Sequence, residues 1–371
     1  MKILILGGTG ILSTDFTKKC IDEENDVYML NRGIHNKFLD ARAKYIIGDL
    51  RSEDVSMLRA KVKHEYFDVV IDFLSFSPEQ LDKSLSMLEG LYKQYVFISS
   101  ATVYDKKGFD TIKEDVTPLG NRNWTYAYNK SLCEYFIRKK NINYTIIRPY
   151  VTYGCSRIPF QIIPDGYNYT LLYRIMENKP VALLDNGSAM CTLTNTIDFA
   201  NILYKLLGNN NAYREAFHIT SKDCVSWRYV YLAYCKILNK VPKMVSVTND
   251  DIWRFMPDYY QILTGDKGTN WIFDISKVMK AIGGYKFTIK LNDGLKSSVN
   301  YYLSHIDMQG IDYRWEGKMD YMIRHSSRYK NMYMLQSDNP NSSKKIDYYL
   351  FNSSVLNEFY MAYWKMRYRK K

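Results

Sequence analysis

The sequence predicts an α/β protein whose N-terminal part is a doubly wound parallel sheet with helices on both faces. Two observations predict it: short apolar runs alternate with helical stretches over the first 150 residues, and a glycine cluster follows the first run directly. Such alternation is typical of parallel strands joined by crossover helices. We expect strands at 2–6, 26–30, 45–47, 68–73, 95–99 and 144–148, with helices that include 14–23, 78–91 and 126–139.

Beyond residue 155 the regular alternation ends. A chain of 371 residues can form one large domain or two unequal ones. We expect a short strand at 216–220 and further helices at 169–178, 197–207, 227–238 and 292–304. Residues 305–371 are rich in Tyr, Met and Arg and predict a C-terminal helical extension, with a helix at 355–369. We interpret this extension as a helical layer or a dimer contact, and alternatively as a basic and aromatic patch for a membrane surface, a glycan carrier or RNA.

The composition is that of an ordinary globular protein, with 46% hydrophobic and 24% charged residues. No apolar run reaches the ~20 residues that span a bilayer, and the first residues lack the pattern of a signal peptide. We therefore expect a cytoplasmic protein without a transmembrane segment. Six scattered cysteines and five histidines show no metal-ligand spacing, so we expect reduced thiols and no metal site.

The net charge of +12 suggests an anionic partner, which can be a nucleotide, a nucleic acid or lipid head groups. The charge is spread thinly except at the end of the chain, where five of the last seven residues are basic. A basic end is most often a solvated terminus. We therefore favour a small anionic ligand and do not expect a nucleic acid as partner.

The glycine cluster at residues 7–10 predicts a dinucleotide site. Glycines between a strand and a helix let the backbone approach a pyrophosphate at the helix N-terminus. Ser13 replaces the third glycine of the usual pattern and still permits close packing. The candidate cofactor contacts in this turn are Gly7, Thr9, Gly10, Ile11 and Leu12.

The end of the second strand bears on the form of the cofactor. An acidic residue there would bind the ribose 2′-hydroxyl of NAD, but this chain has Asn31-Arg32-Gly33. The adjacent arginine slightly favours NADP over NAD; alternatively, Arg32 is solvated and Asn31 serves either ribose. Asp49 is placed to accept from the adenine amino group. The remaining candidate cofactor contacts are Asn31, Arg32, Asp49, Leu50, Phe73, Ser99, Lys130 and Tyr150.

Tyr126 and Lys130 are spaced four residues apart, which puts them on one face of a helix. A phenol is a poor base at neutral pH because its pKa is ~10, and a neighbouring ammonium lowers that pKa. We predict Tyr126 as the acid and base, Lys130 as the group that lowers its pKa and holds the nicotinamide ribose, and Ser100 as the group that orients the substrate oxygen. The alternative is that Tyr126 packs and Lys130 is a surface charge.

These motifs, in this order, resemble the extended short-chain dehydrogenase/reductase superfamily, the NAD-dependent epimerase/dehydratase family. The similarity covers roughly residues 1–304. It implies a Rossmann domain at 1–155, continued by about 189–222, a smaller discontinuous C-terminal substrate domain at 156–188 and 223–304, and an extension at 305–371. It also implies a homodimer. The matching segments include 7–13, 48–50, 97–104, 126–130 and 148–154.

Two departures from the family pattern narrow the expected activity. The 4,6-dehydratases carry an Asp-Glu pair just after the active-site Ser or Thr, where this chain has Ala101-Thr102, so we expect no such elimination. Ser-Ala-Thr-Val-Tyr at this place resembles the 4-epimerases instead. Epimerases commonly bind the substrate diphosphate with an arginine at a position that is Cys191 here, which weakens the case for an ordinary nucleotide sugar.

The chain also resembles an atypical branch of the family that includes chloroplast stem-loop-binding proteins. The residues that carry this resemblance are Asn31-Arg32-Gly33 at the end of the second strand and Asp72-Phe73 with Pro78 and Gln80. Members of that branch tend to lose the catalytic residues, which this chain keeps. We therefore predict an NAD(P)-dependent epimerase or ketoreductase that acts on a nucleotide-linked sugar or a similar hydroxylated substrate. The alternative is an RNA-binding or regulatory protein on a Rossmann scaffold.

Overall fold

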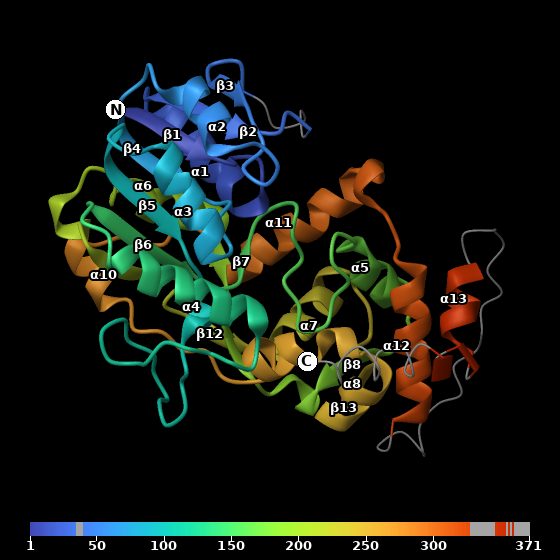
Figure 1. Ribbon diagram of the computed structural model, residues 1–371. Coiled ribbons are helices and arrows are strands. Elements are labelled where there is room, and N and C mark those ends of the chain that lie inside the picture. The colour runs from blue at the N-terminus through green and yellow to red at the C-terminus, as the bar shows by residue number, and fades with distance from the viewer. Residues whose placement is uncertain (35–39, 327–345, 354, 357, 360–371) are drawn as a thin grey trace. The chain divides into compact units, whose positions relative to one another are not determined.

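The computed structural model describes residues 1–34, 40–326 and 346–359, the last range without 354 and 357. The chain divides into two compact units (Figure 1). Unit 1 comprises Met1–Gly154, Thr192–Cys224 and Trp271–Leu291, and unit 2 comprises Cys155–Cys191, Val225–Asn270 and the described part of Asn292–Lys371. Residues 271–291 thus belong to unit 1, although we expected them with 223–304. Most of the helix predicted at 355–369 lies outside the described residues.

Unit 1 is built on a seven-stranded parallel sheet with the order β11-β6-β5-β4-β1-β2-β3. The predicted doubly wound sheet is confirmed. The strands are β1 (Lys2–Leu6), β2 (Asp26–Asn31), β3 (Lys44–Ile47), β4 (Phe67–Asp72), β5 (Tyr92–Ile98), β6 (Tyr144–Pro149) and β11 (Glu215–Ile219).

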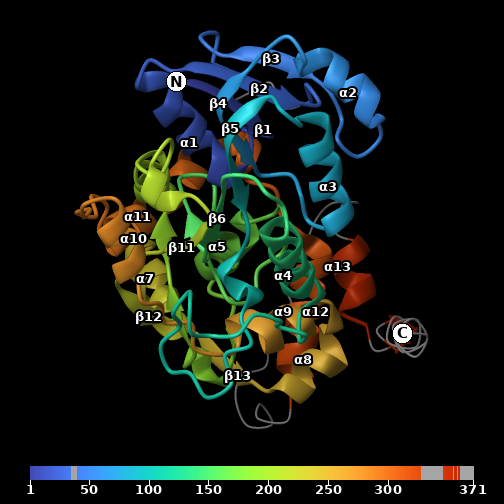
Figure 2. The ribbon, with the colours of Figure 1, turned by 60° about the vertical axis from the view of Figure 1, so that its left-hand side comes forward.

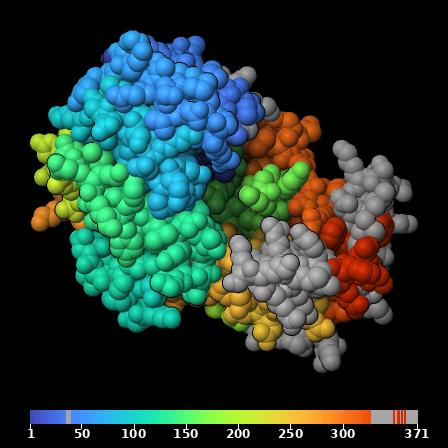
Figure 3. Space-filling model, viewed as in Figure 1, coloured from blue at the N-terminus to red at the C-terminus, as the bar shows by residue number. Residues whose placement is uncertain are grey.

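Helices cover both faces of this sheet because its strands are apolar on both sides. In β1, Ile3 and Ile5 face one hydrophobic core and Leu4 and Leu6 face the other, as the two-residue period of a strand requires. The first core includes α1 (Ile11–Asp22), α6 (Thr196–Tyr204) and α10 (Ser276–Ala281); the second includes α2 (Val55–Val62), α3 (Pro78–Met87) and α4 (Thr125–Arg138) (Figure 2). On the outside, the blue-to-green segments of unit 1 form one continuous surface (Figure 3).

The strand order reverses between β1 and β4, which is where open α/β sheets bind their ligands. Leu6 and Asp72 are paired at the carboxyl ends of these two strands. The chain therefore leaves both strands at the same level, with Gly7 after β1 and Phe73 after β4. The fold itself places the glycine turn and the segment 73–75 side by side.

Unit 2 has its own core, to which the C-terminal extension contributes. α12 (Tyr313–His325), which we did not delimit from the sequence, buries Trp315, Met319 and Met322 against the short parallel pair of β8 (Val181–Leu184) and β13 (Met244–Val247). Among the described residues, the other α-helices that lie wholly in unit 2 are α5 (Tyr169–Met176), α7 (Trp227–Ile237), α8 (Asn249–Phe255), α9 (Tyr260–Ile262) and α13 (Ile346–Phe351).

The remaining strands and α-helix of the described residues are short or lie at the limits of the units. They are β7 (Thr152–Tyr153), β9 (Met190–Thr192), β10 (Thr194–Asn195), β12 (Cys224–Ser226) and α11 (Leu291–Ser304). Among the residues that the structure describes, no helix has both the length and the apolar character that crossing a membrane demands.

A buried ionic cluster joins α5 to α12 in unit 2. Arg174 is fully buried and donates to Glu316 Oε1 at 3.1 Å and to Asp320 Oδ1 at 2.5 Å. Lys179 Nζ also bonds Glu316 at 2.9 Å, and Tyr348 donates to Asp320 at 2.8 Å. The positive and negative charges compensate one another, so removal of one member would leave an uncompensated charge buried in unit 2.

We expect Arg174→Ala to lower the free energy of unfolding of unit 2 by about 3–5 kcal/mol, because it leaves two carboxylates buried without their main partner. Urea unfolding followed by tryptophan fluorescence measures the loss. Lys236→Ala, which removes an exposed positive charge from α7 of the same unit, is the matched control and should change stability little. Equal losses in the two variants would contradict this interpretation.

Candidate cofactor site and catalytic residues

The turn after β1 has a backbone that only glycine adopts easily. Gly7 and Gly8 have φ of +104° and +94°, and a Cβ on Gly8 would lie 2.5 Å from Met29 Cε. Gly10 is the N-cap of α1, and its amide donates to Ser13 Oγ at 2.9 Å. Ser13, which replaces the third glycine, therefore stabilises the start of the helix instead of only allowing close packing.

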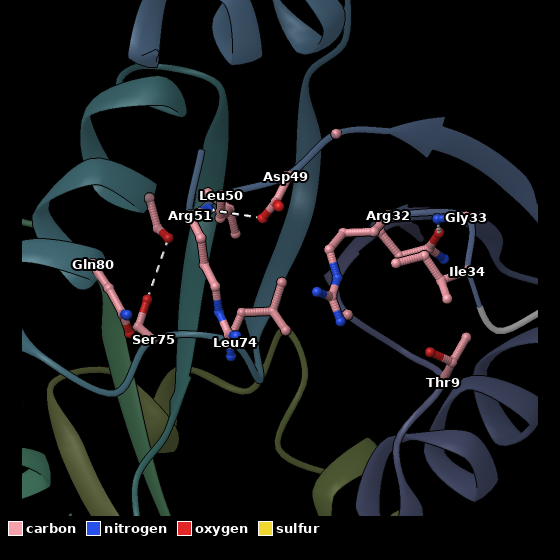
Figure 4. A pocket seen from close by; sticks show the side chains of 14 residues that line it. Thr9, Arg32, Gly33, Ile34, Asp49, Leu50, Arg51, Leu74, Ser75 and Gln80 are labelled. Carbon is pink, nitrogen blue, oxygen red and sulfur yellow. Dashed lines mark hydrogen bonds between the residues drawn. The ribbon is translucent and has the colours of Figure 1, made fainter. Parts of the chain in front are cut away.

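A pocket in unit 1 opens beside this turn (Figure 4). It is bounded by the ends of β1, β2, β3 and β4 and by the start of α3. Its lining residues are Gly7, Thr9, Asn31, Arg32, Gly33, Ile34, Gly48, Asp49, Leu50, Arg51, Leu74, Ser75, Gln80 and Ser84. Six of the predicted cofactor contacts are brought together here: Gly7, Thr9, Asn31, Arg32, Asp49 and Leu50.

Asn31 gives the pocket an unused hydrogen-bond donor. Its Oδ1 accepts from Gly33 N at 2.9 Å, while its Nδ2 is buried and has no acceptor among the described residues. A buried donor without a partner costs free energy, which a ligand acceptor at this place would recover. The glycine turn, the helix N-terminus and this donor fit the adenosine and pyrophosphate parts of a dinucleotide.

Charged side chains surround the same pocket. Arg32 and Arg51 extend into it from the ends of β2 and β3 (Figure 4). Asp49 Oδ1 accepts from Arg51 N at 2.9 Å, and this bond, with the charges of both arginines, lowers the pKa of the Asp49 carboxyl. Sequence reasoning did not single out Arg51; its place two residues after Asp49, at the carboxyl end of a strand, was the available signal.

The other predicted cofactor contacts lie outside the lining of this pocket. Gly10, Ile11 and Leu12 begin α1. Phe73 packs on Phe16, with ring centroids 5.9 Å apart, and Ser99 donates to Glu134 Oε1 at 2.6 Å. Tyr150 is buried and stacks on Trp271 at 5.6 Å. Sequence reasoning missed Leu74, Ser75 and Ser84, which line the pocket because α3 and the end of β4 pack together.

Lys130, on α4, is buried and held by backbone carbonyls. Its Nζ donates to Ser75 O at 2.7 Å and to Ile98 O at 2.8 Å, and it lies 4.4 Å from the centroid of Phe76. Burial lowers the pKa of Lys130 to about 8, while the charge of Asp72 acts in the opposite direction. Two of the three ammonium hydrogens are engaged by carbonyls, so one remains for a further acceptor.

Tyr126 lies in the first turn of α4, one turn before Lys130, and is half-buried. Its ring centroid is 6.1 Å from that of Phe76 and 4.7 Å from that of Trp124. Because Lys130 Nζ contacts the same Phe76 ring, both side chains lie on one side of the helix. The predicted pairing of Tyr126 with Lys130 on one helix face agrees with this arrangement.

Ser100 follows β5 and begins a short 3-10 turn. Its hydroxyl is nearly buried, lies 2.8 Å from Thr102 Oγ1 and accepts from Thr102 N at 3.3 Å. Ile98, whose carbonyl binds Lys130, is two residues before it. The end of β5 therefore positions both Ser100 and one acceptor of Lys130.

A series of buried polar groups, connected by hydrogen bonds, extends from Glu134 on α4 to His218 on β11. Glu134, one turn after Lys130 on α4, forms an ion pair with Arg148 of β6 and accepts from Ser99. Arg148 donates to the Tyr104 hydroxyl, which bonds His218 Nε2 at 2.5 Å. Burial lowers the pKa of His218 to about 3, so this imidazole is neutral at physiological pH.

Two further predictions concern cysteines and metals. None of the six cysteines forms a disulfide, and the described residues contain no group of three or more His, Cys, Asp or Glu side chains that could hold a metal ion. In unit 2, Cys191 is buried and its thiol donates to Val225 O at 3.3 Å. The residue that stands where epimerases commonly have an arginine is thus part of the packed interior.

We expect Lys130→Met to change how stability depends on pH. Lys130 loses its proton near pH 8 when folded and near 10.5 when unfolded, so the unfolded state binds more protons between these values. The free energy of unfolding of the native protein should therefore rise with pH over this window by up to about 1.4 kcal/mol per unit more than that of the variant. Urea unfolding from pH 7 to 10.5 measures the difference; parallel curves would show that Lys130 is not titrated in this way.

The chain matches the model of the NAD dependent epimerase/dehydratase family over residues 3–219, which is more than half of its length. It is 27% identical over 243 residues to the chloroplast stem-loop binding protein of 41 kDa b of Arabidopsis thaliana, covering 61% of this chain and 60% of that protein. It is 30% identical over 179 residues to a UDP-glucose 4-epimerase of Lactobacillus helveticus, covering 42% and 53%. The chain thus spans less than two thirds of the length of these curated relatives.

Solved structures show the same fold at lower identity. An epimerase from Methanothermobacter thermautotrophicus superposes with a TM-score of 0.68 at 16% identity, over 83% of this chain and 93% of that one. A UDP-glucuronic acid 4-epimerase from Bacillus cereus, in complex with UDP-glucuronic acid and NAD, gives 0.65 at 19% identity, over 81% and 98%. From its sheet, its glycine turn and the family match over residues 3–219, we conclude that the chain belongs to the NAD dependent epimerase/dehydratase family.

Proposed function

We propose that the protein is an NAD(P)-dependent epimerase acting on a nucleotide-linked sugar or a similar hydroxylated substrate. The observation that carries the proposal is the placement of Lys130 and Tyr126 on one side of α4, with Lys130 bound to the carbonyl of Ser75, which lines the pocket. Membership of the family and the likeness to a UDP-glucose 4-epimerase support it. A ketoreductase uses the same residues and differs only in consuming the reduced cofactor.

The residues would divide the chemistry as follows. A bound nicotinamide dinucleotide supplies the acceptor and donor of hydride. Tyr126 takes the proton of the substrate hydroxyl when the carbon is oxidised and returns it on reduction. The ammonium of Lys130 favours the phenolate of Tyr126, and its remaining N–H would donate a hydrogen bond to the ribose of a bound nicotinamide nucleotide. Ser100 donates to the substrate oxygen and keeps it within reach of Tyr126.

An epimerase oxidises its substrate and returns the hydride to the other face of the same carbon, so it shows no net cofactor turnover. Ala101-Thr102 after Ser100 supplies no acid and base pair for elimination of water. The absence of that pair favours epimerisation over 4,6-dehydration. The homodimer that the family resemblance implies stays a prediction.

We expect Tyr126→Phe to lower the turnover of UDP-glucose or UDP-glucuronic acid by about 10²–10⁴-fold, because the phenol oxygen that moves the proton is absent. Proton NMR of the sugar detects the epimer, and calorimetry should show dinucleotide binding close to that of the native protein. Tyr128→Phe, two residues along the same helix, is the matched control and should keep most of the activity.

RNA binding is the second candidate, favoured by the likeness to a chloroplast stem-loop binding protein and by the net charge of +12. If the protein bound a stem-loop RNA with a steep dependence on salt, and Tyr126→Phe left the biological activity intact, this candidate would replace the enzyme. A co-purifying dinucleotide, identified by mass spectrometry, would instead support the enzyme.

We further propose that the pocket prefers NADP to NAD. Asn31 replaces the acidic residue that binds a 2′-hydroxyl, and Arg32 and Arg51 bring two positive charges to the same pocket. A 2′-phosphate next to these guanidinium groups would form charge-assisted hydrogen bonds.

We expect Arg32→Ala and Arg51→Ala each to weaken NADPH binding about tenfold or more while changing NADH binding little. Fluorescence titration of the two reduced cofactors measures the ratio of dissociation constants. Lys107→Ala removes an exposed positive charge of unit 1 away from the pocket and should leave the ratio unchanged. A native protein that binds NADH more tightly than NADPH would show that the cofactor is NAD.

A further inference from the structure

Asp72, at the end of β4, is a fully buried carboxylate to which the chemistry above gives no role. It accepts four hydrogen bonds. Leu74 N and Ser75 N donate to Oδ1 at 2.7 and 3.0 Å, and the hydroxyls of Ser75 and Tyr95 donate to Oδ2 at 2.5 and 2.7 Å. Three of the four donors belong to the segment that follows the strand directly.

These bonds determine the shape of residues 73–75. The side chain of Asp72 folds back onto the amides two and three residues ahead, which closes a turn at the carboxyl end of the strand. The turn leaves the carbonyl of Ser75 directed at Lys130 Nζ, 2.7 Å away. Leu74 and Ser75 also line the pocket, so one carboxylate shapes both a wall of the pocket and an acceptor of Lys130.

Asp72 also acts on Lys130 through its charge. No described carboxylate lies within ion-pair distance of Nζ, whose bonded partners are the two carbonyls. The charges that act on it come from Asp72 on β4 and from Cys133 and Glu134 on α4. Tyr95 on β5 contacts Asp72, and Tyr126 on α4 packs near the Phe76 ring that Nζ also contacts. Burial raises the pKa of Cys133 to about 12 and that of Tyr95 also, so these two groups are neutral. Among the contributions that raise the pKa of Lys130, the charge of Asp72 is the largest.

We propose that Asp72 is a positioning residue for the proposed reaction: its carboxylate folds residues 73–75 so that Ser75 holds Lys130, and it places a negative charge in the same buried region as that ammonium. The role of Asp72 in catalysis rests on the proposed function, whereas the contacts that position Lys130 all lie within unit 1. The bonds to Tyr95 and Ser75 tie β4, β5 and α4 into one arrangement, so a shift of the carboxylate displaces the pocket wall and Lys130 together.

The test compares Asp72→Asn with Tyr95→Phe in the full chain. Asp72→Asn removes the charge but keeps an oxygen acceptor, whereas Tyr95→Phe removes one donor and keeps the charge. NMR of selectively ¹³Cε-labelled lysine, with the Lys130 signal assigned from Lys130→Met, follows the titration without any ligand. We expect the midpoint of Lys130 to fall by roughly one pH unit in Asp72→Asn and to stay near the native value in Tyr95→Phe. An unchanged midpoint in folded Asp72→Asn would overturn the electrostatic part of the proposal.

Asp72→Glu tests the positioning part and serves if Asp72→Asn fails to fold. It retains the charge but moves the carboxylate by one methylene, so the turn at 73–75 must adjust. We expect the Lys130 midpoint to stay within a few tenths of a unit, while NADPH and NADH bind several-fold more weakly by calorimetry. Native affinity in Asp72→Glu would overturn the positioning role. If the proposed function is wrong, the native protein binds neither dinucleotide. The Lys130 midpoint still falls in Asp72→Asn in that case, so the two failures are distinguishable.

Discussion

The buried ion pair between Arg148 and Glu134 is the interaction on which the geometry of unit 1 depends. Both side chains are almost fully removed from water, which costs several kcal/mol per charge unless the remaining lone pairs and hydrogens find partners. Ser99 and Tyr104 supply those partners, from the end of β5 and the turn that follows it. The pair therefore fixes α4 against β5 and β6, and breaking one partner would leave an uncompensated charge in the core.

The same helix carries Tyr126, Lys130 and Glu134 at successive turns. Exposure falls along this series, from the half-buried phenol to the ammonium and then to the fully buried carboxylate. Glu134 anchors the helix, Lys130 reaches the carbonyls of two strand ends, and Tyr126 stands nearest to solvent. A proton-transfer group needs access to a substrate, whereas the group that tunes its pKa benefits from burial, and one amphipathic helix provides both.

The two units differ in how much they share with the family. The family model spans residues 3–219, which includes most of unit 1, with the sheet, the glycine turn and the candidate catalytic residues, but only the segment Cys155–Cys191 of unit 2. Unit 2 has an ionic core of its own around Arg174, completed by Glu316 and Asp320 of α12. Cys191, which is packed into unit 2, stands where the family resemblance predicts an arginine for the substrate diphosphate. Substrate recognition is therefore where we expect this chain to depart from its relatives.

The sequence alone determined the strands of the sheet and the glycine turn, because these depend on local pattern. Apolar runs of the right length end at Gly, Asn or Asp, and the positive φ of Gly7 and Gly8 excludes most other residues. The spacing of Tyr126 and Lys130 likewise follows from the helical repeat. The end of helix α3 was misplaced: it stops at Met87 rather than 91, where Gly90 adopts a φ of +74°.

Tertiary structure decided which candidates meet. Ser99, Phe73 and Tyr150 follow strands as cofactor contacts do, and the structure places them against Glu134, Phe16 and Trp271. They lie outside the pocket lining, and their contact with a cofactor stays a prediction. Arg51, Ser75 and Ser84 enter the pocket because β3, β4 and α3 converge there, which no local pattern records. The same holds for Lys130. Its place in the sequence suggested an ammonium beside a phenol. Only the fold shows that Lys130 is buried and donates to two backbone carbonyls. Burial lowers its pKa, and the charge of Asp72 opposes that change.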